Sequence, residues 1–333
     1  MNVDTTQLLK DSLKFQKTFC VYPFLHEHKN TSKKRLLCCH SNSYSKNELS
    51  ENDLSEIRNH MLKNKAVTEC AGCYKLENNK EISPRQKANK EWKKHLNLLD
   101  KAIHDHLNKK TIKPVWYDLR TSNLCNLECQ MCNAKASSSI AKRQGINRPF
   151  LTWDTDSNIN PKSVKVYLAG GEPFLIKSFS DRLNKITNTD CEIVINTNCT
   201  TLTSYMLEAL DRFHDINFTC SIDGYDKLNN LIRINSNFED IDKNIDILAE
   251  RYPSASFHVN TVVQKDNINY LQDLAQWIHN KKIISLWTLS ILTKPEYFHY
   301  SNAPSIDIPE LIFDYPLIKN NPANVYTLKN IKG

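Results

Sequence analysis

The chain has 333 residues, of which 40% are hydrophobic and 24% are charged, with 44 Lys and Arg against 37 Asp and Glu. These values are ordinary for a globular protein with a buried core, arranged as one large domain or as two of unequal size. No apolar run reaches the roughly 18 to 20 residues that a membrane span needs, so the sequence argues against a membrane protein.

The start of the chain contains Asp4 and Asp11 and no cationic segment that leads into a long apolar stretch. The sequence therefore predicts no signal peptide and a cytoplasmic protein. Eleven cysteines in such a reducing compartment are not expected to form disulfides, and an odd number cannot all pair. Metal binding, redox chemistry or burial as apolar thiols remain as their roles.

The region before residue 113 is irregular and polar, and it carries its own set of cysteines: Cys20, Cys38, Cys39, Cys70 and Cys73. Two adjacent cysteines do not readily bind one metal centre together, so we take Cys39 as the ligand, with Cys38 as the alternative, beside the other three. Four thiolates suit either a zinc ion or a [4Fe–4S] cluster, and His40 keeps a mixed Cys3His zinc site possible. Spacing alone does not separate these readings.

Positive charge is concentrated in residues 75–113, which hold ten Lys and one Arg against five acidic residues. Helical patterns cover residues 54–63 and 83–108, and the second carries most of these charges. Because acidic residues alternate with the basic ones, we interpret the segment as a solvated helix face. Contact with an anionic partner, such as an acidic reductase or substrate, is the alternative.

After residue 113, β-branched or aromatic runs alternate regularly with amphipathic stretches. The predicted strands cover residues 115–121, 164–169, 191–196, 216–222, 256–263 and 285–292, and the predicted helices include 203–213, 238–251 and 268–280. Strands that alternate with helices imply parallel βα units, and hence an α/β sheet or an open barrel. In such folds the chemistry lies on loops at the C-terminal ends of the strands.

Three cysteines follow the first predicted strand directly: Cys125, Cys129 and Cys132, spaced x3 and then x2. Thiolates are the usual ligands of iron–sulfur clusters, and three on a compact loop can hold three irons of a [4Fe–4S] cube. The fourth iron then stays open for another ligand. The alternatives are zinc or thiols buried without a metal, but zinc normally recruits four ligands, and no fourth Cys or His lies nearby in the sequence.

Two adjacent glycines end the second predicted strand, in the run Gly170-Gly171-Glu172-Pro173, although the whole chain has only six glycines. Without a Cβ, these positions let the backbone approach a ligand closely, and Glu172 can accept a hydrogen bond from an ammonium group. The alternative is a tight turn with Glu172 exposed to solvent.

In this order and at these strand ends, the cysteine triad and the Gly-Gly-Glu-Pro run resemble the radical SAM superfamily, whose members share a partial (β/α)6 barrel. The resemblance implies that the open iron chelates S-adenosylmethionine. It also implies that an electron from the cluster cleaves this cofactor to a 5′-deoxyadenosyl radical, which takes a hydrogen atom from the substrate. Met131 stands where the family usually has an aromatic residue, a mild departure because a thioether can also pack over adenine.

The resemblance extends to later strand ends. It implies that Asn198 lies near the cofactor, that Ser221 and Asp223, in a Ser-x-Asp-Gly run, face the methionine carboxylate or the ribose, and that Arg233 pairs with the carboxylate. For each residue the alternative is a turn or cap that satisfies backbone groups. The remaining cysteines have no chelating spacing and are interpreted as buried apolar residues: Cys191, Cys199 and Cys220.

The N-terminal cysteine pattern resembles the twitch subgroup of radical SAM proteins. The matching features are Cys-x2-Pro-Phe, Cys-Cys, Ile57-Arg58-x2-Met61-Leu62, Cys-x2-Cys, Glu77 and Ser83-x-Arg85. The resemblance implies an auxiliary [4Fe–4S] cluster there, with zinc as the alternative. Such a cluster would relay an electron or hold the barrel mouth closed. The usual turn glycine before Cys-Cys is replaced by Lys33-Lys34-Arg35, so the hairpin is expected to differ.

The sequence thus predicts an α/β enzyme with a twitch-like domain over residues 1–112, a radical SAM barrel over 113–295 and a tail over 296–333 that packs on the barrel. A peptide or protein is the expected substrate, with a small metabolite, nucleotide sugar or nucleobase as the alternative. The chemistry implies an electron donor such as flavodoxin or ferredoxin, whereas a membrane and a nucleic acid are not expected as partners. A non-catalytic iron–sulfur or zinc scaffold is the competing class, but it predicts a damaged triad or a missing Gly-Gly-Glu.

Overall fold

The computed structural model describes residues 18–29, 35–41, 48–120, 122–146, 159–292 and 294–303. The chain divides into two compact units, the N-terminal unit (Met1–Thr121 with Ser157–Val166) and the C-terminal unit (Ser122–Asp156 with Tyr167–Gly333). Most of the predicted tail, and Lys33 and Lys34 of the predicted hairpin turn, lie outside the described residues.

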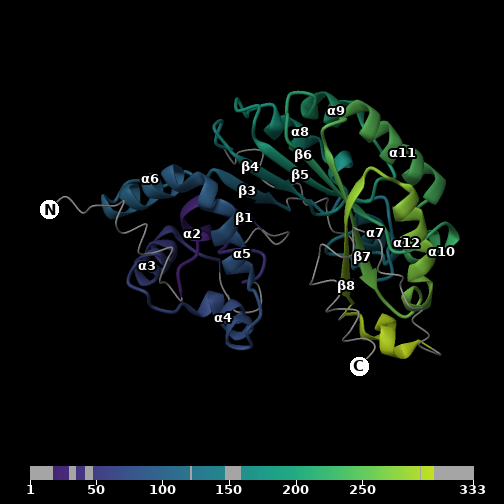
Figure 1. The fold of residues 1–333 in the computed structure, drawn as a ribbon, viewed down its shortest axis with the longest axis horizontal. Coiled ribbons are helices and arrows are strands. Elements are labelled where there is room, and N and C mark those ends of the chain that lie inside the picture. The colour runs from purple at the N-terminus through teal and green to yellow at the C-terminus, as the bar shows by residue number, and fades with distance from the viewer. Residues whose placement is uncertain are drawn as a thin grey trace. The chain divides into compact units, whose positions relative to one another are not determined.

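The N-terminal unit combines helices with three short strands (Figure 1). Its helices are α2 (Tyr22–Leu25), α3 (Glu51–Leu62), α4 (Ala71–Asn78), α5 (Pro84–Glu91) and α6 (Leu96–Leu107), with 3-10 turns η1 (Thr68–Cys70) and η2 (Trp92–His95). Strand β1 (His26–Lys29) pairs antiparallel with β2 (Arg35–Leu36) and parallel with β3 (Trp116–Leu119). The register places His28 opposite Asp118, and His28 Nδ1 lies 3.0 Å from Asp118 Oδ2.

Serine caps explain why helices begin in this polar stretch. The Ser50 hydroxyl accepts a hydrogen bond from the N–H of Asp53 at the start of α3, and the Ser83 hydroxyl accepts one from the N–H of Gln86 at the start of α5. In both cases the third helical residue hydrogen-bonds back to the cap, which satisfies two orphan donors reciprocally. Pro84 follows its cap at a position where no N–H is needed.

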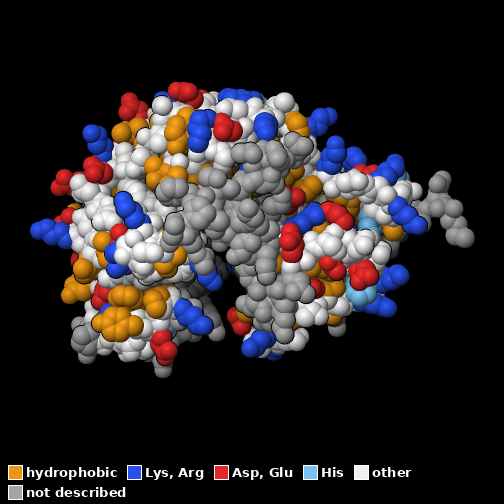
Figure 2. Space-filling model, turned by 180° about the vertical axis from the view of Figure 1, so that it is seen from behind, with side chains coloured by type: hydrophobic (Ala, Val, Ile, Leu, Met, Phe, Trp, Pro, Cys, Tyr) orange, Lys and Arg blue, Asp and Glu red, His pale blue; other side chains and the backbone are white. Residues whose placement is uncertain are grey.

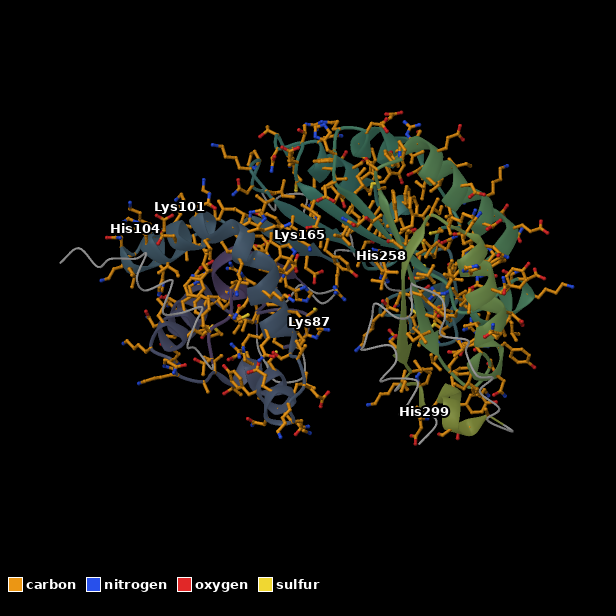
Figure 3. The ribbon with its side chains drawn as sticks, viewed as in Figure 1. Lys87, Lys101, His104, Lys165, His258 and His299 are labelled. Atoms are coloured by element: carbon orange, nitrogen blue, oxygen red, sulfur yellow. The ribbon has the colours of Figure 1, made fainter. Side chains whose placement is uncertain are left out.

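Aromatic rings fill the core of the N-terminal unit. Trp92 stacks on Trp116 with ring centroids 5.2 Å apart, and Phe19 stacks on Phe24 at 5.5 Å. The buried side of α6 adds apolar side chains at helical spacing, and its other side is charged. Lys101, on that exposed side, forms an ion pair with Asp105 one turn later (Figure 3). On the face drawn in Figure 2, Lys and Arg side chains likewise lie among acidic ones, as expected of a solvated surface.

The C-terminal unit alternates strands with helices. Its strands are β5 (Glu192–Thr197), β6 (Ile216–Ser221), β7 (Ser256–Val263) and β8 (Ile284–Ile291), and the chain passes from one unit to the other within β4 (Lys165–Leu168). Its helices are α7 (Ser138–Arg143), α8 (Lys177–Leu183), α9 (Ser204–Leu210), α10 (Lys227–Ile232), α11 (Phe238–Arg251) and α12 (Leu271–Asn280), with 3-10 turns η3 (Pro173–Leu175), η4 (Ile268–Tyr270), η5 (Glu296–Phe298) and η6 (Tyr300–Asn302).

Amphipathic patterning explains these elements. In β7 every second residue is buried, so one face of the strand lies in the core and the other is half-buried. Helix α11 buries Phe238, Ile241, Ile245 and Leu248, which recur at the spacing of one helix face, and it begins at an Asn237 cap. Figure 1 shows α8, α9, α11 and α12 along the outer side of the strands β5 to β8.

The strands form an eight-stranded sheet in the order β2-β1-β3-β4-β5-β6-β7-β8, and pairs β5–β6, β6–β7 and β7–β8 are parallel. This arrangement confirms the predicted α/β fold class, and all six predicted strands are present with ends shifted by at most two residues. Strands β1 and β2 were not predicted, because runs of four and two residues show no periodicity. Of the helices that the structure describes, none has the length and apolar character needed to cross a membrane.

Candidate functional site

Three partly exposed cysteines, Cys125, Cys129 and Cys132, lie on the loop between β3 and α7, where the sequence predicted them. The backbone N–H of Leu127 donates to Cys125 Sγ at 3.5 Å. Burial raises the pKa of the Cys125 thiol to about 12, and the charges of Cys129 and Cys132 act in the same direction. The three thiols thus lie on one partly buried loop, and three cysteines on a single loop are the ligand pattern of an iron–sulfur cluster.

Consecutive serines at the start of α7 hold this loop. The Ser138 hydroxyl accepts a hydrogen bond from the N–H of Cys125 at 3.1 Å, and the Ser139 hydroxyl donates to the Cys125 carbonyl at 2.8 Å. The Ser137 hydroxyl donates to the carbonyl of Leu127 at 2.7 Å and also caps α7. These serines were not among the predicted site residues, although a serine run before a helix is a recognisable cap signal.

The Gly-Gly-Glu run packs directly on the start of the cysteine loop. The N–H of Gly171 donates to the Ser122 carbonyl at 2.8 Å, and the N–H of Glu172 donates to the Leu124 carbonyl at 2.7 Å. A Cβ on Gly171 would lie 2.0 Å from the Leu124 oxygen, and Gly170 has a φ of +124°. The sequence suggested that the backbone here approaches a ligand closely. In the structure, the backbone at Gly171 instead approaches the protein's own cysteine loop.

The carboxylate of Glu172 is fully buried and connects two strand ends. Its Oε1 accepts hydrogen bonds from the Thr197 hydroxyl at 2.7 Å and from the N–H of Phe174 at 3.1 Å, and its Oε2 accepts one from the N–H of Asn198 at 2.7 Å. The Asn198 side chain then donates to Asn126 Oδ1, inside the cysteine loop, at 3.0 Å. Glu172 and Asn198 thereby tie the ends of β4 and β5 to that loop.

Glu172 is expected to make stability depend on pH. Burial raises its pKa from 4.5 to about 7, despite the hydrogen bonds that favour the charged form. The folded state therefore keeps a proton that the unfolded state loses between these two values. Its stabilising contribution is complete below about pH 4.5 and is lost as the pH rises through about 7, a change of about 3 kcal/mol.

Urea unfolding of the wild type and of Glu172→Gln at several pH values between 5 and 8 measures this effect. The Gln variant has no ionisable group at this position, so the difference in unfolding free energy between the two proteins should change with pH in that range. A difference that stays constant would show that Glu172 does not titrate with a raised pKa.

Ser221, Asp223 and Arg233 lie at and beyond the end of β6. The Ser221 hydroxyl is half-buried and donates to Asn196 Oδ1 at 3.2 Å. Asp223 is fully buried, and its Oδ2 lies 2.8 Å from Arg233 Nη2. Arg233 Nη1 lies 3.9 Å from Cys129 Sγ. The arginine that the resemblance assigned to a ligand carboxylate thus contacts, in this structure, an internal carboxylate and one of the three thiols.

A row of polar side chains continues across the half-buried face of the sheet. The register places Ser221 opposite Asn260 and Asn260 opposite Thr288. His258 lies on the same face of β7, two residues before Asn260 (Figure 3). Burial lowers the pKa of His258, so its neutral form is favoured. This face offers hydrogen-bonding groups to a ligand beside Ser221.

The other cysteines of this unit, Cys191, Cys199 and Cys220, are fully or almost fully buried, which confirms their interpretation as core residues. Cys199 and Cys220 contact each other, and this contact and burial raise the pKa of Cys199. Among the described residues, no three His, Cys, Asp or Glu side chains converge closely enough for a single metal ion. A cubane cluster spreads its thiolates over several irons, so three thiols on one loop still fit it and leave one iron without a protein ligand.

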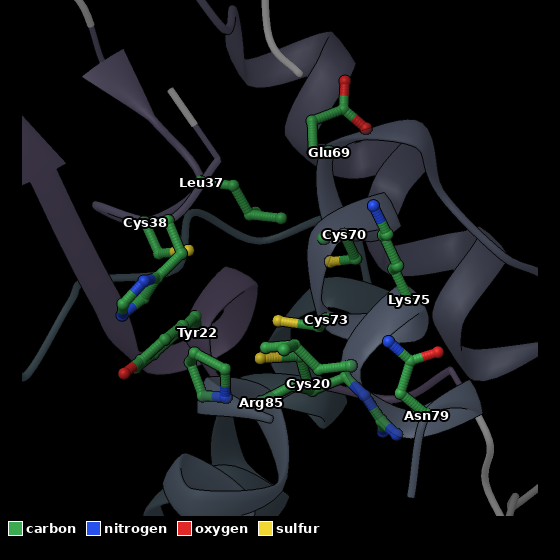
Figure 4. Close-up of a pocket in the computed structure, with 14 residues that line it drawn as sticks. Cys20, Tyr22, Leu37, Cys38, Glu69, Cys70, Cys73, Lys75, Asn79 and Arg85 are labelled. Atoms are coloured by element: carbon green, nitrogen blue, oxygen red, sulfur yellow. The ribbon is translucent and has the colours of Figure 1, made fainter. Parts of the chain in front are cut away.

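Four cysteines line a cavity of about 360 Å³ in the N-terminal unit. The sulfur atoms of Cys20, Cys38, Cys70 and Cys73 point into it from three segments of the chain, with Cys70 and Cys73 on the continuous η1–α4 segment (Figure 4). All four side chains are buried, and burial raises the pKa of Cys38 and of Cys70 to about 12. Four thiols that line one cavity are the ligand types of a closed metal centre, although among the described residues no three of them lie close enough to bind a single ion.

The predicted ligand of the adjacent pair is Cys39, but in the structure Cys38 is the one that faces the cavity. Cys38 lines the cavity and Cys39 does not. Cys39 lies in the following turn, where burial and the charge of Asp118 raise the pKa of its thiol. The N–H and hydroxyl of Ser41 both donate to the Cys38 carbonyl, at 3.1 and 2.8 Å, and fix this turn.

The polar residues of the N-terminal pattern position these cysteines. Arg85 donates to the Phe19 carbonyl, next to Cys20, at 2.6 Å and to Glu77 Oε1 at 3.0 Å. The Ser83 hydroxyl also donates to Glu77. Arg58 donates to a carbonyl of α2 at 2.7 Å. The charged members of the motif thus join the segment that carries Cys20 to α4, on which Cys73 lies.

Comparison with known proteins gives one family match that covers this region. A family model described as the radical SAM superfamily matches residues 119–278, a range that contains the three-cysteine loop, the Gly-Gly-Glu run and Arg233. A search among curated proteins gave no match.

Solved structures with similar coordinates include native anSMEcpe with bound AdoMet, at 17% identity and a TM-score of 0.43, with 55% of this chain and 52% of that chain covered. Streptococcus suis SuiB aligns at 16% identity and a TM-score of 0.42, with 88% of this chain and 65% of that chain covered. SuiB bound to its precursor peptide SuiA aligns at 16% identity and a TM-score of 0.41. The chain thus spans about half the length of anSMEcpe and 65% of SuiB.

Proposed function

We propose, from the match of residues 119–278 to the radical SAM superfamily, that the chain is an enzyme that cleaves S-adenosylmethionine reductively at a [4Fe–4S] cluster bound by Cys125, Cys129 and Cys132. These three cysteines would hold the cluster, which when bound would supply the electron for that cleavage and so the radical chemistry that removes a hydrogen atom from the substrate. The observation that carries the proposal is the loop itself, whose three thiols lie in the region that matches the family and whose backbone is fixed by the α7 serines.

Residues around the loop would prepare the site for the cofactor. We assign cofactor binding to Gly170, Gly171, Glu172, Asn198, Ser221, Asp223 and Arg233. Because Glu172 and Asp223 are fully buried, they would act by positioning the cysteine loop and the guanidinium. Ser221 is half-buried at a strand end, so it has surface that a ligand can contact.

Anaerobic reconstitution with iron and sulfide, followed by addition of dithionite and S-adenosylmethionine, tests this function. The wild-type protein is expected to release 5′-deoxyadenosine, detected by chromatography, even when the physiological substrate is absent. A protein that binds a cluster on the loop but forms no 5′-deoxyadenosine would instead be a non-catalytic iron–sulfur scaffold.

For the substrate we propose a peptide or protein, because the N-terminal cysteine pattern resembles twitch proteins, whose auxiliary-cluster domains often accompany peptide substrates. A small metabolite, nucleotide sugar or nucleobase is the alternative. Flavodoxin or ferredoxin is the kind of donor that would deliver the electron. A gene for a short peptide beside the gene for this chain would support the first choice.

For the N-terminal cavity we propose an auxiliary [4Fe–4S] cluster bound by Cys20, Cys38, Cys70 and Cys73. Support comes from the four cysteines that line one cavity and from the resemblance to twitch proteins. Zinc is the alternative, since it accepts the same ligands. With all its irons bound by thiolates, this cluster would have no open position for S-adenosylmethionine.

A matched pair of substitutions tests which cysteine serves this cavity. Reconstituted wild-type protein should hold about eight iron atoms per chain if both sites carry four-iron clusters. Cys38→Ala should lower this to about four, because it removes a thiol that lines the cavity, whereas Cys39→Ala should leave about eight. Iron and zinc contents measured by plasma emission spectroscopy decide the outcome. Four irons with one zinc in the wild type would contradict the auxiliary cluster, and loss of iron in Cys39→Ala alone would contradict the choice of Cys38.

A further inference from the structure

Cys129 and Arg233 lie opposite each other on two backbone segments that are 104 residues apart in sequence. The N–H groups of Glu128 and Gln130, on either side of Cys129, donate to the carbonyls on either side of Arg233 at 3.0 and 2.9 Å. The side chain of Gln130 adds a hydrogen bond from Gln264, at 2.7 Å. This pairing fixes the separation of the two residues by the backbone, so the guanidinium does not depend on a flexible loop for its position.

Asp223 then fixes the direction of the guanidinium. Its Oδ2 lies 2.8 Å from Arg233 Nη2, while its Oδ1 accepts a hydrogen bond from the N–H of Val262 at 2.7 Å. The N–H of Asp223 donates to the side chain of Asn229 at 3.0 Å. Asp223 is fully buried and Arg233 is only 8% exposed, so solvent screens neither charge well.

The orientation of the guanidinium brings its other nitrogen close to the sulfur of Cys129. With Arg233 Nη2 held by the carboxylate, Nη1 lies 3.9 Å from Cys129 Sγ. A cation that donates to a thiolate stabilises negative charge on it, and hydrogen bonds to sulfur together with net local charge set the potentials of iron–sulfur clusters.

We propose that Arg233, oriented by Asp223, sets the reduction potential of the cluster bound by Cys125, Cys129 and Cys132. The guanidinium raises this potential by stabilising the more negative, reduced form, and the Asp223 carboxylate limits the increase. This role rests on the proposed function, because it requires a cluster on the loop. It makes Arg233 a positioning and tuning residue that acts before any cofactor binds.

Redox titration of the reconstituted protein, followed by electron paramagnetic resonance and carried out without S-adenosylmethionine, tests the proposal. Arg233→Gln should lower the reduced-to-oxidised ratio at a fixed potential about tenfold, a shift of about −59 mV for a one-electron couple. Asp223→Asn should shift the potential the opposite way, because the guanidinium then acts without an opposing charge. Arg233→Lys, which keeps the charge and loses the planar fork, should recover part of the wild-type value.

Opposite shifts are the decisive result, since general damage to the site would move both variants in the same direction. Arg251→Gln is the matched control, because it removes the same charge from the partly exposed Arg251–Asp211 pair and should leave the potential unchanged. The signal of this cluster is identified as the one that disappears in Cys125→Ala. If Asp223→Asn does not fold, the Arg233→Gln and Arg233→Lys pair still decides.

Two failures can be told apart. If no cluster forms on the loop of the wild-type protein, the proposed function itself is wrong. If the cluster forms and Arg233→Gln has the wild-type potential, the tuning role alone is overturned. Weaker binding of S-adenosylmethionine by that variant, with an unchanged potential, would then assign Arg233 to the cofactor carboxylate.

Discussion

Replacing any one of Cys125, Cys129 and Cys132 by Ala is expected to abolish 5′-deoxyadenosine formation under dithionite. Each thiol would hold one iron of the cluster, and the loop offers no nearby cysteine as a replacement, because the other cysteines of this unit are buried in or beside strands. Loss of a partner one shell beyond a metal typically costs 10 to 100-fold in affinity or activity, so loss of a direct ligand should exceed about 100-fold. Chromatography of the reaction products and the iron content per chain measure both effects.

Cys191→Ala is the matched control for these variants. It removes a fully buried thiol in the same unit that the site does not use, so cluster content and 5′-deoxyadenosine formation should stay at wild-type levels. Formation of 5′-deoxyadenosine by any triad variant would sink the mechanism. Equal losses in Cys191→Ala would show that the assay reports folding and not cluster binding.

The sequence was sufficient for the strands and motifs of the C-terminal unit because each depends on local signals. Alternating burial in β7 appears in the sequence as alternating polarity, and the three cysteines of the loop are recognisable by spacing. The contacts between distant residues have no such local signal. The pairing of Cys129 with Arg233 needs the fold, since only the fold brings two segments 104 residues apart into register.

Glu172 and Cys38 are two further cases in which the sequence alone could not predict the contacts of a residue. The sequence identified Glu172 as a site residue, but its partners Thr197 and Asn198 lie at the end of another strand, so its full burial was not predictable. Cys38 and Cys39 are chemically identical neighbours, and only the turn fixed by Ser41 decides which of them faces the cavity. Residue type therefore predicted which kinds of side chain the sites contain, and tertiary structure decides which of their atoms face one another.

Gly171→Ala is expected to destabilise the protein by about 3 kcal/mol or more, because the added Cβ would meet backbone that cannot rotate away. The new atom would lie 2.0 Å from the Leu124 oxygen and 2.8 Å from the carbonyl carbon of Asn123. To relieve this overlap, the strand end and the cysteine loop must separate. That movement breaks the hydrogen bonds from Gly171 to Ser122 and from Glu172 to Leu124, which hold the start of the loop.

Two other glycines provide a graded comparison in the same unit. Gly224→Ala would place its Cβ 2.7 Å from Cγ of Leu228, a side chain that can shift, so a smaller loss is expected. Gly145→Ala meets nothing within 4 Å and has only its φ of +64° against it, which costs about 1 to 2 kcal/mol. Urea unfolding gives the three free energies, and iron content gives the state of the loop. If Gly171→Ala were no more destabilising than Gly145→Ala and kept its iron, the contact between the Gly-Gly-Glu run and the cysteine loop would not be what holds the cluster site in place.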